Sequence, residues 1–189
     1  MGGYVLGLIT PLNLAMASVV AIGAAYNAGS KEVDNYRKAL VLSGNQTGSS
    51  IEQLQAMARS ISAVSGTQSA AAAGLAEMAQ YSRVGAESLQ EFTSAALQFE
   101  KATGQAISET AKQFAELAKE PLSATLKLNE GTNYLTESIY VQIKALEQQG
   151  KAAEAGAVAQ KAWADALTSR SSEITNNLGY IEKSWNAVK

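Results

Sequence analysis

Residues 133–167 have the sequence "NYLTESIYVQIKALEQQGKAAEAGAVAQKAWADAL", and this stretch decides the fold. Its "QQGK" segment supplies turn chemistry, and an alanine-rich helix is expected after it, from about Ala152 to Thr168. Before the turn, bulky apolar residues recur at the three- and four-residue spacing that is typical of one helix face: Leu135, Ile139, Ile143 and Leu146. The stretch therefore predicts two helices joined by a short turn.

The same stretch resembles a helix-turn-helix repeat of the tetratricopeptide kind, because bulky residues fill its first helix and small ones its second. Arrays of such repeats need several stacked copies to bury a core, and one copy is weak support. An ordinary helical hairpin is favoured, and a repeat module that binds proteins, with 135–168 as its unit, is kept as an alternative.

Upstream of this stretch, amphipathic segments alternate with short breaks. "SGNQTGSS" (43–50) is turn chemistry, and Ser50 with Gln53 forms a capping box that opens a helix. Before it, "SKEVDNYRKAL" (30–40) puts four residues on one helical face: Val33, Tyr36, Ala39 and Leu40. The helix after the capping box has the stripe Ile51, Leu54, Met57, Ala58, Ile61 and Val64.

Further breaks are expected at "SGTQS", "SRVGAES", "ATGQAIS" and "KEP". Ser88 with Glu91 indicates a second capping box. The residue before Pro121 disfavours the α conformation, so a helix should end there. A short piece from Leu122 to Leu128 and the turn "NEGTN" (129–133) should follow.

A separate final helix is expected after Thr168. Its apolar stripe runs to the end of the sequence, which predicts that the chain is part of something longer. Over the whole chain, the residues expected to pack in a helical core are Ile51, Leu54, Ile61, Phe92, Phe99, Phe114, Ile139, Ile143, Leu146, Trp163, Leu178, Ile181 and Trp185. The fold class is all-α, with serial helices that are either extended or folded back into hairpins or a bundle.

The amino-acid composition excludes several kinds of functional site. The 189 residues include no cysteine and no histidine, so disulfides, Cys/His zinc sites and His-based catalytic triads are excluded. The net charge of −2 gives no basic footprint for sequence-specific nucleic-acid binding. We expect no enzyme, cofactor or metal site. Much of the 47% apolar content is alanine, which predicts a thin core with close helix contacts.

The first 30 residues carry no charge, and they are set apart from the amphipathic region 31–189. The run from Tyr4 to Ala28 exceeds the ~20 residues that span a bilayer as a helix. No basic residue precedes it, which argues against a signal peptide. A membrane helix and a helix covered by protein are equally favoured. Candidates for packing there are Leu14, Ala17, Val20, Ala21 and Ala25.

The order of segments carries a family resemblance. "KALVLSGN" (38–45), "AKEPLSATLKLNE" (118–130) and "NLGYIEKSW" (177–185) are its most specific parts. Together with the apolar opening, they resemble the tail length tape measure protein of long-tailed, lambda-like phages and prophages. The resemblance covers roughly Gly3 to Lys189. Because full-length members are several times longer, the chain looks like an internal segment with an added Met1.

The resemblance implies a structural tail protein that sets the length of the tail tube and takes part in genome ejection. Implied partners are the tail tube protein, tail tip or initiator proteins, tail assembly chaperones, other tape measure chains and the host membrane. Implied locations are the tail lumen of the virion, the host cytoplasm during assembly and the host envelope on infection. An extended helix of 189 residues would measure roughly 280 Å. A small membrane-active helical protein is a further alternative.

Overall fold

The computed structural model describes residues 31–42, 44, 48–81 and 83–188, and for 64–65 and 178–188 it describes the backbone alone. The apolar run from Tyr4 to Ala28, with its candidate packing residues between Leu14 and Ala25, lies outside these residues.

Every regular element in the described part of the chain is an α-helix, as the sequence predicted. A helix covers residues 31–42, and seven helices follow in series. They are α2 (Ile51–Ser65), α3 (Gln68–Tyr81), α4 (Ala86–Thr103), α5 (Ile107–Lys119), α6 (Pro121–Thr132), α7 (Glu137–Gln148) and α8 (Ala152–Val188).

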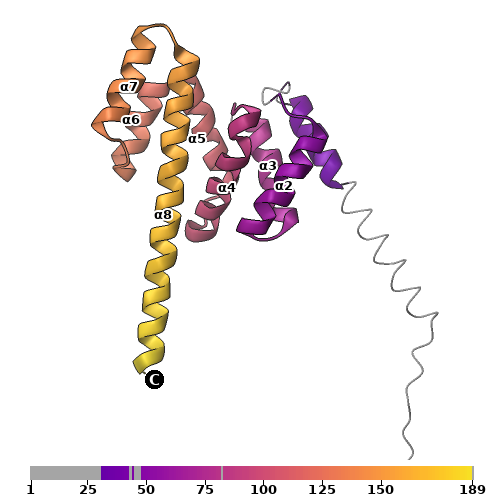
Figure 1. Cartoon of the computed structure of the whole chain (residues 1–189), viewed down its shortest axis with the longest axis vertical. Coiled ribbons are helices and arrows are strands. Elements are labelled where there is room, and N and C mark those ends of the chain that lie inside the picture. The colour runs from indigo at the N-terminus through magenta and orange to yellow at the C-terminus, as the bar shows by residue number, and fades with distance from the viewer. Residues whose placement is uncertain (1–30, 43, 45–47, 82, 189) are drawn as a thin grey trace, which may run out of the picture.

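The helices fold back on one another, and α8 is the element that holds them together (Figure 1). The N-terminal half of α8 contacts α4, α5, α6 and α7, while α3 contacts α2, α4 and α5. The C-terminal part of α8 extends beyond the other helices (Figure 1). The sequence left two forms open, an extended chain and a folded-back bundle. The structure adopts the bundle.

Several predicted boundaries are confirmed. The capping box at Ser50 is formed, because Gln53 N donates to Ser50 Oγ and Ser50 N donates to Gln53 Oε1. Gly66 ends α2, and Gly104 ends α4 in the left-handed conformation that glycine tolerates. Pro121 occupies the first turn of α6, where its missing N–H costs nothing. Gly150 turns the chain between α7 and α8 with φ +73°.

The capping box predicted at Ser88 and Glu91 is wrong. The helix begins earlier, at Ala86, and Gly85 is its N-cap without a side-chain hydrogen bond. The amides of Ser88 and Leu89 both donate to Gly85 O at 3.1 Å, which places Ser88 inside the first turn. Glycine is an acceptable N-cap, so a competing serine three residues later did not mark the start.

The turn predicted at "NEGTN" is also wrong for most of its length. Helix α6 runs through it to Thr132 and stops only at Asn133, which has φ +50°. Thr132 Oγ1 donates to Leu128 O, and Asn129 Oδ1 accepts from Leu135 N. The side chains of this segment therefore support the helix end instead of breaking the helix.

The two helices predicted after residue 152 are one continuous helix of 37 residues. The "TSRSS" segment (168–172) contains no glycine or proline to end it. The hydroxyls of Thr168, Ser171, Ser172 and Thr175 each donate to the carbonyl four residues earlier, so these polar residues stay within the helix. This length also distinguishes the α7–α8 hairpin from a tetratricopeptide-like unit with a short second helix.

Alanine is the most frequent residue in the core, which agrees with the predicted close helix contacts. Larger side chains fill the space between these alanines: Tyr36, Leu54, Leu75, Met78, Leu89, Phe114, Leu117 and Leu167 are all fully buried.

Candidate functional site

The predicted packing residues are distributed over the whole bundle. Fully or almost fully buried are Leu54, Ile61, Phe92, Phe114, Ile143 and Trp163. Half-buried and packed against this core are Ile51, Phe99, Ile139 and Leu146. The side chains of Leu178, Ile181 and Trp185 lie outside the described ones, although the backbone there is helical.

Two aromatic pairs organise the core. The rings of Phe92 on α4 and Phe114 on α5 stack with centroids 5.0 Å apart and planes 9° apart. The rings of Tyr134, in the α6–α7 connection, and Trp163 on α8 are also 5.0 Å apart, tilted by 60°. Such pairs add to the free energy gained from burial alone, so they anchor α5 to α4 and the α6–α7 connection to α8.

The α5–α8 contact depends on two residues that sequence reasoning missed. Gln160 is buried, and its Nε2 donates to Phe114 O at 2.8 Å across the interface. At Gly156, a Cβ would lie 3.2 Å from Ala118 Cα and 3.3 Å from Ala118 O. Glycine thus permits the close approach of the two backbones. The small-residue run "AEAGA" was the only available signal for this contact.

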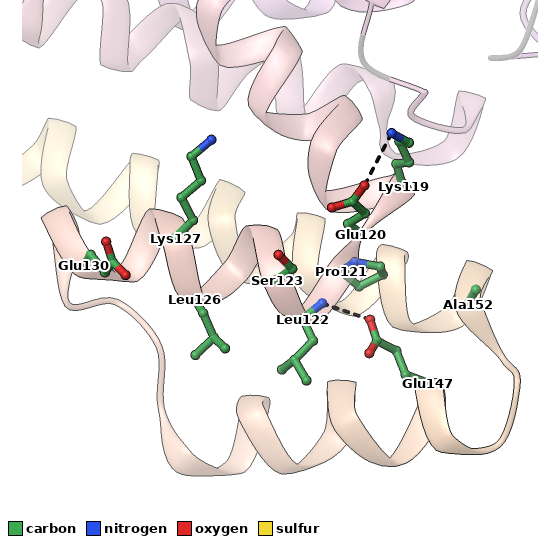
Figure 2. A pocket seen from close by; sticks show the side chains of 10 residues that line it. All are labelled: Lys119, Glu120, Pro121, Leu122, Ser123, Leu126, Lys127, Glu130, Glu147 and Ala152. Atoms are coloured by element: carbon green, nitrogen blue, oxygen red, sulfur yellow. Dashed lines mark hydrogen bonds and ion pairs between the residues drawn. The ribbon is translucent and has the colours of Figure 1, made fainter.

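The start of α6 is held by α7. Leu122 N donates to Glu147 Oε1 at 3.0 Å, so a carboxylate satisfies a free amide of the first turn (Figure 2). Beside this bond lies a hollow of about 750 Å³, lined mainly by the end of α5 and by α6, with Glu147 of α7 and Ala152 of α8 at its edge. Figure 2 shows Leu122 and Leu126 projecting toward α7. The hollow could not be predicted from the sequence, because its lining comes from the end of α5, from α6, from α7 and from the start of α8.

Two lysines that line the hollow lie close to carboxylates. Lys119 Nζ lies 3.3 Å from Glu120 Oε1, and Lys127 Nζ lies 3.8 Å from Glu116 Oε2 (Figure 2 shows the first pair). These exposed pairs contribute little to stability.

A second cluster links α4 to α8. Lys161 Nζ lies 3.0 Å from Glu91 Oε1 and also contacts Asp165 Oδ1. Hydrogen bonds to Asp165 and then to Glu91 raise the pKa of Lys161 above its ordinary value. The arrangement is a solvent-exposed clamp across two helices.

Buried tyrosines account for further perturbed groups. Burial, followed by the charge of Glu32, raises the pKa of Tyr36, whose hydroxyl donates to Glu32 Oε1 at 3.1 Å. Burial likewise raises the pKa of Tyr134. Both hydroxyls are therefore neutral at physiological pH, and both rings lie in helix contacts.

Within the described residues, no set of three or more acidic, histidine or cysteine side chains is placed to hold a metal ion. Among the same residues, no helix combines the length and apolarity that crossing a bilayer requires. The apolar run from Tyr4 to Ala28 lies outside the described residues.

The fold and these surfaces define a class of protein: an α-helical scaffold whose polar side chains serve caps, ion pairs and helix contacts. The family model of the prophage tail length tape measure protein matches residues 1–144. This is more than half of the chain, and the chain belongs to that family.

Three curated tape measure proteins are similar to the chain. The protein of Pseudomonas phage PAJU2 is 28% identical over 189 residues, which is 100% of this chain and 21% of the relative. That of Escherichia phage N15 is 27% identical over 169 residues, 89% of this chain and 20% of the relative. That of Escherichia phage lambda is 22% identical over 181 residues, 96% of this chain and 21% of the relative.

The chain thus spans about a fifth of the length of these relatives. No solved structure matches it. Family membership supports a structural role in the phage tail and a location in the virion tail.

Proposed function

We propose that the chain is a segment of the ruler that sets phage tail length during assembly. One observation carries the proposal: the helices follow one another in series, and the breaks from α2 to α8 are one to four residues long. Helices rise 1.5 Å per residue, so such a chain has a length fixed by its residue count once it is drawn out.

The bundle itself is too short to use that length. Helix α8, the longest element, measures about 55 Å from its 37 residues. The whole chain would measure roughly 280 Å as one extended helix. If the segment contributes its full extended length to the ruler, the α4–α5–α8 contacts must open. If the bundle persists, the segment contributes about 55 Å, which is about a fifth of the extended length.

An in-frame deletion of these 189 residues in the parent phage tests the proposal. Tail length is measured by electron microscopy. We expect shortening by about 280 Å if the segment is extended in the tail, and by about 55 Å if the bundle persists. Tails of unchanged length would refute a ruler role for this segment.

A matched control replaces the segment with an unrelated amphipathic helical sequence of equal length. Because the ruler acts through residue count, tails carrying the replacement should keep the parental length. Two results together would indicate a role other than measurement: tails of parental length in the deletion variant, and no tails in the replacement variant.

We further propose that the partners are tail tube subunits, tail tip or initiator proteins, assembly chaperones and other tape measure chains, and that the segment takes part in genome ejection and envelope passage. The family name supports the tail context. The uncharged run Tyr4–Ala28 supports contact with a host membrane. Flotation of the full chain with liposomes, compared with a variant in which Val20 and Ala21 are both changed to Asp, tests the membrane contact; equal recovery in the floating fraction would exclude insertion of this run.

A further inference from the structure

Two of the large apolar side chains that are exposed in the described chain, Leu42 and Tyr81, meet at one edge of the bundle, and Val41 precedes Leu42 in the chain. Val41 is 74% exposed and Leu42 69%, both at the end of helix 31–42, and Tyr81 at the end of α3 is 40% exposed. Leu42 and Tyr81 line one shallow hollow of about 460 Å³. Exposed apolar side chains that share one surface with charged neighbours indicate a contact site.

Cations frame these apolar residues. Arg83 and Lys112 line the same hollow, and Lys38 lies one helical turn before Leu42 on the same face. None of the three forms an ion pair within the described residues, whereas the neighbouring Arg37 pairs with Asp34. Glu116 is the acidic residue of the hollow, and it faces Lys127 on α6. The surface thus combines exposed apolar side chains with two cations and one carboxylate in the hollow, and Lys38 beside Leu42 adds a third cation.

Arg83 is held there at a conformational cost. It has φ +53°, in the left-handed region that residues other than glycine rarely adopt. Glycine would be relaxed at this position in the α3–α4 connection, and Gly85 lies two residues further on. An exposed arginine in this conformation is consistent with a contact role for its side chain.

We propose that this basic–apolar surface, made by Lys38, Val41, Leu42, Tyr81, Arg83 and Lys112, contacts an anionic lipid bilayer. This proposal rests on the membrane contact proposed above. It adds which residues make the contact and that the lipid is anionic. Apolar side chains enter the headgroup boundary, tyrosine suits that interface, and lysine and arginine attract anionic lipids.

The position of helix 31–42 in the chain favours a bilayer over a protein partner. Helix 31–42 follows directly after the uncharged run Tyr4–Ala28, which is long enough to span a hydrocarbon core. If that run enters a bilayer, the helix lies within a few residues of the headgroups. Val41 and Leu42 are the most exposed of the large apolar side chains in the described chain, so both are accessible to a surface outside the bundle.

The absence of cysteine allows a site-specific test with the full chain. Leu42→Cys carries an environment-sensitive fluorophore, and Val141→Cys on α7, where Val141 is 55% exposed, is the matched control. With vesicles of phosphatidylglycerol and phosphatidylcholine, the label at position 42 should shift to the blue and be quenched by a lipid-borne quencher. The label at position 141 should do neither, and pure phosphatidylcholine should give a weaker response.

Charge variants test the contribution of Lys112 and Arg83. Lys112→Glu should weaken partition onto the anionic vesicles at least about fivefold, and adding Arg83→Glu should weaken it at least about 25-fold in all. Lys144→Glu on α7 makes the same change in net charge away from the surface and should leave partition unchanged. Far-UV circular dichroism of each variant verifies that the bundle is folded.

The possible outcomes distinguish a wrong surface from the absence of any membrane contact. A chain that binds vesicles while the label at position 42 stays in water would overturn the surface and leave membrane binding in place. A chain that binds no vesicle would overturn both. Self-association that is lost in the charge variants, with vesicle binding unchanged, would assign the surface to a protein partner and overturn the proposal.

Discussion

The α4–α5–α8 contact and the α6–α7 end of the bundle are built from similar helices but packed differently. At the first, Phe92 and Phe114 stack, and Gly156 lets two backbones approach. At the second, Ile143 is the only fully buried residue of α7, Leu126 and Val141 are exposed, and a hollow lies beside α6. Stability should therefore be concentrated in the first region, and the second should open at lower cost.

The largest effect should come from removing the ring at the centre of the dense region. Phe114→Ala deletes a fully buried ring and its stack with Phe92, so we expect a loss of about 3 to 5 kcal/mol in the free energy of unfolding, measured by urea denaturation. Val141→Ala should change it by less than about 0.5 kcal/mol. Equal losses from both variants would remove the distinction between the regions.

Two helical glycines should respond to alanine with opposite signs. Alanine at either position gains up to ~1 kcal/mol of helix propensity. At Gly156 the added Cβ would press on the backbone of Ala118, so α5 and α8 must separate and we expect a net loss of about 1 kcal/mol. At Gly131 in α6 nothing lies within 4 Å, so the gain should remain. Thermal melting of both variants checks the difference in sign.

Breaking the hydrogen bond between α7 and the start of α6 should have an effect of similar size to that at Gly156 and well below that of Phe114→Ala. Glu147→Ala leaves Leu122 N without its acceptor, and we expect a loss of about 1 kcal/mol. Glu130→Ala, on the same rim of the hollow, should have no measurable effect. Hydrogen exchange offers a finer readout, since only Glu147→Ala should speed exchange of amides in the first turn of α6.

The smallest effect is expected at the exposed clamp. Its partners raise the pKa of Lys161, so its contribution is fully present below the unfolded-state value and is lost as pH rises through the folded-state one. Lys161→Ala should cost under about 1 kcal/mol at neutral pH, and less in high salt. Denaturation midpoints at pH 7 and pH 11 should therefore differ less in the variant than in the parent chain, unless Lys161 contributes nothing.

Sequence patterns were informative where the decisive interactions are local. The capping box of Ser50 and Gln53, the proline at the start of α6 and the glycine after α7 act within a few residues of themselves. Errors occurred where two local signals competed. Ser88 lost to Gly85 as the start of α4, and the polar segment from Thr168 to Ser172 continued α8 through hydroxyl bonds to its own carbonyls.

The hollow and the basic–apolar surface could not be predicted in the same way. Leu42, Tyr81 and Lys112 belong to three helices, and no periodicity within one helix shows that they meet. Likewise, the pairing of Gln160 with Phe114 O joins residues far apart in the sequence, and a glutamine in a helix is ordinarily solvated.

The sequence by itself determined an all-α chain of serial amphipathic helices, the position of most breaks, and the absence of cysteine and histidine chemistry. These properties depend on residue type and spacing along a few turns. Only the tertiary structure decided that the helices fold back around α8, that α8 is continuous, and which exposed residues share a surface. Those outcomes depend on which distant faces bury each other best, and that competition is settled only when all the helices are packed together.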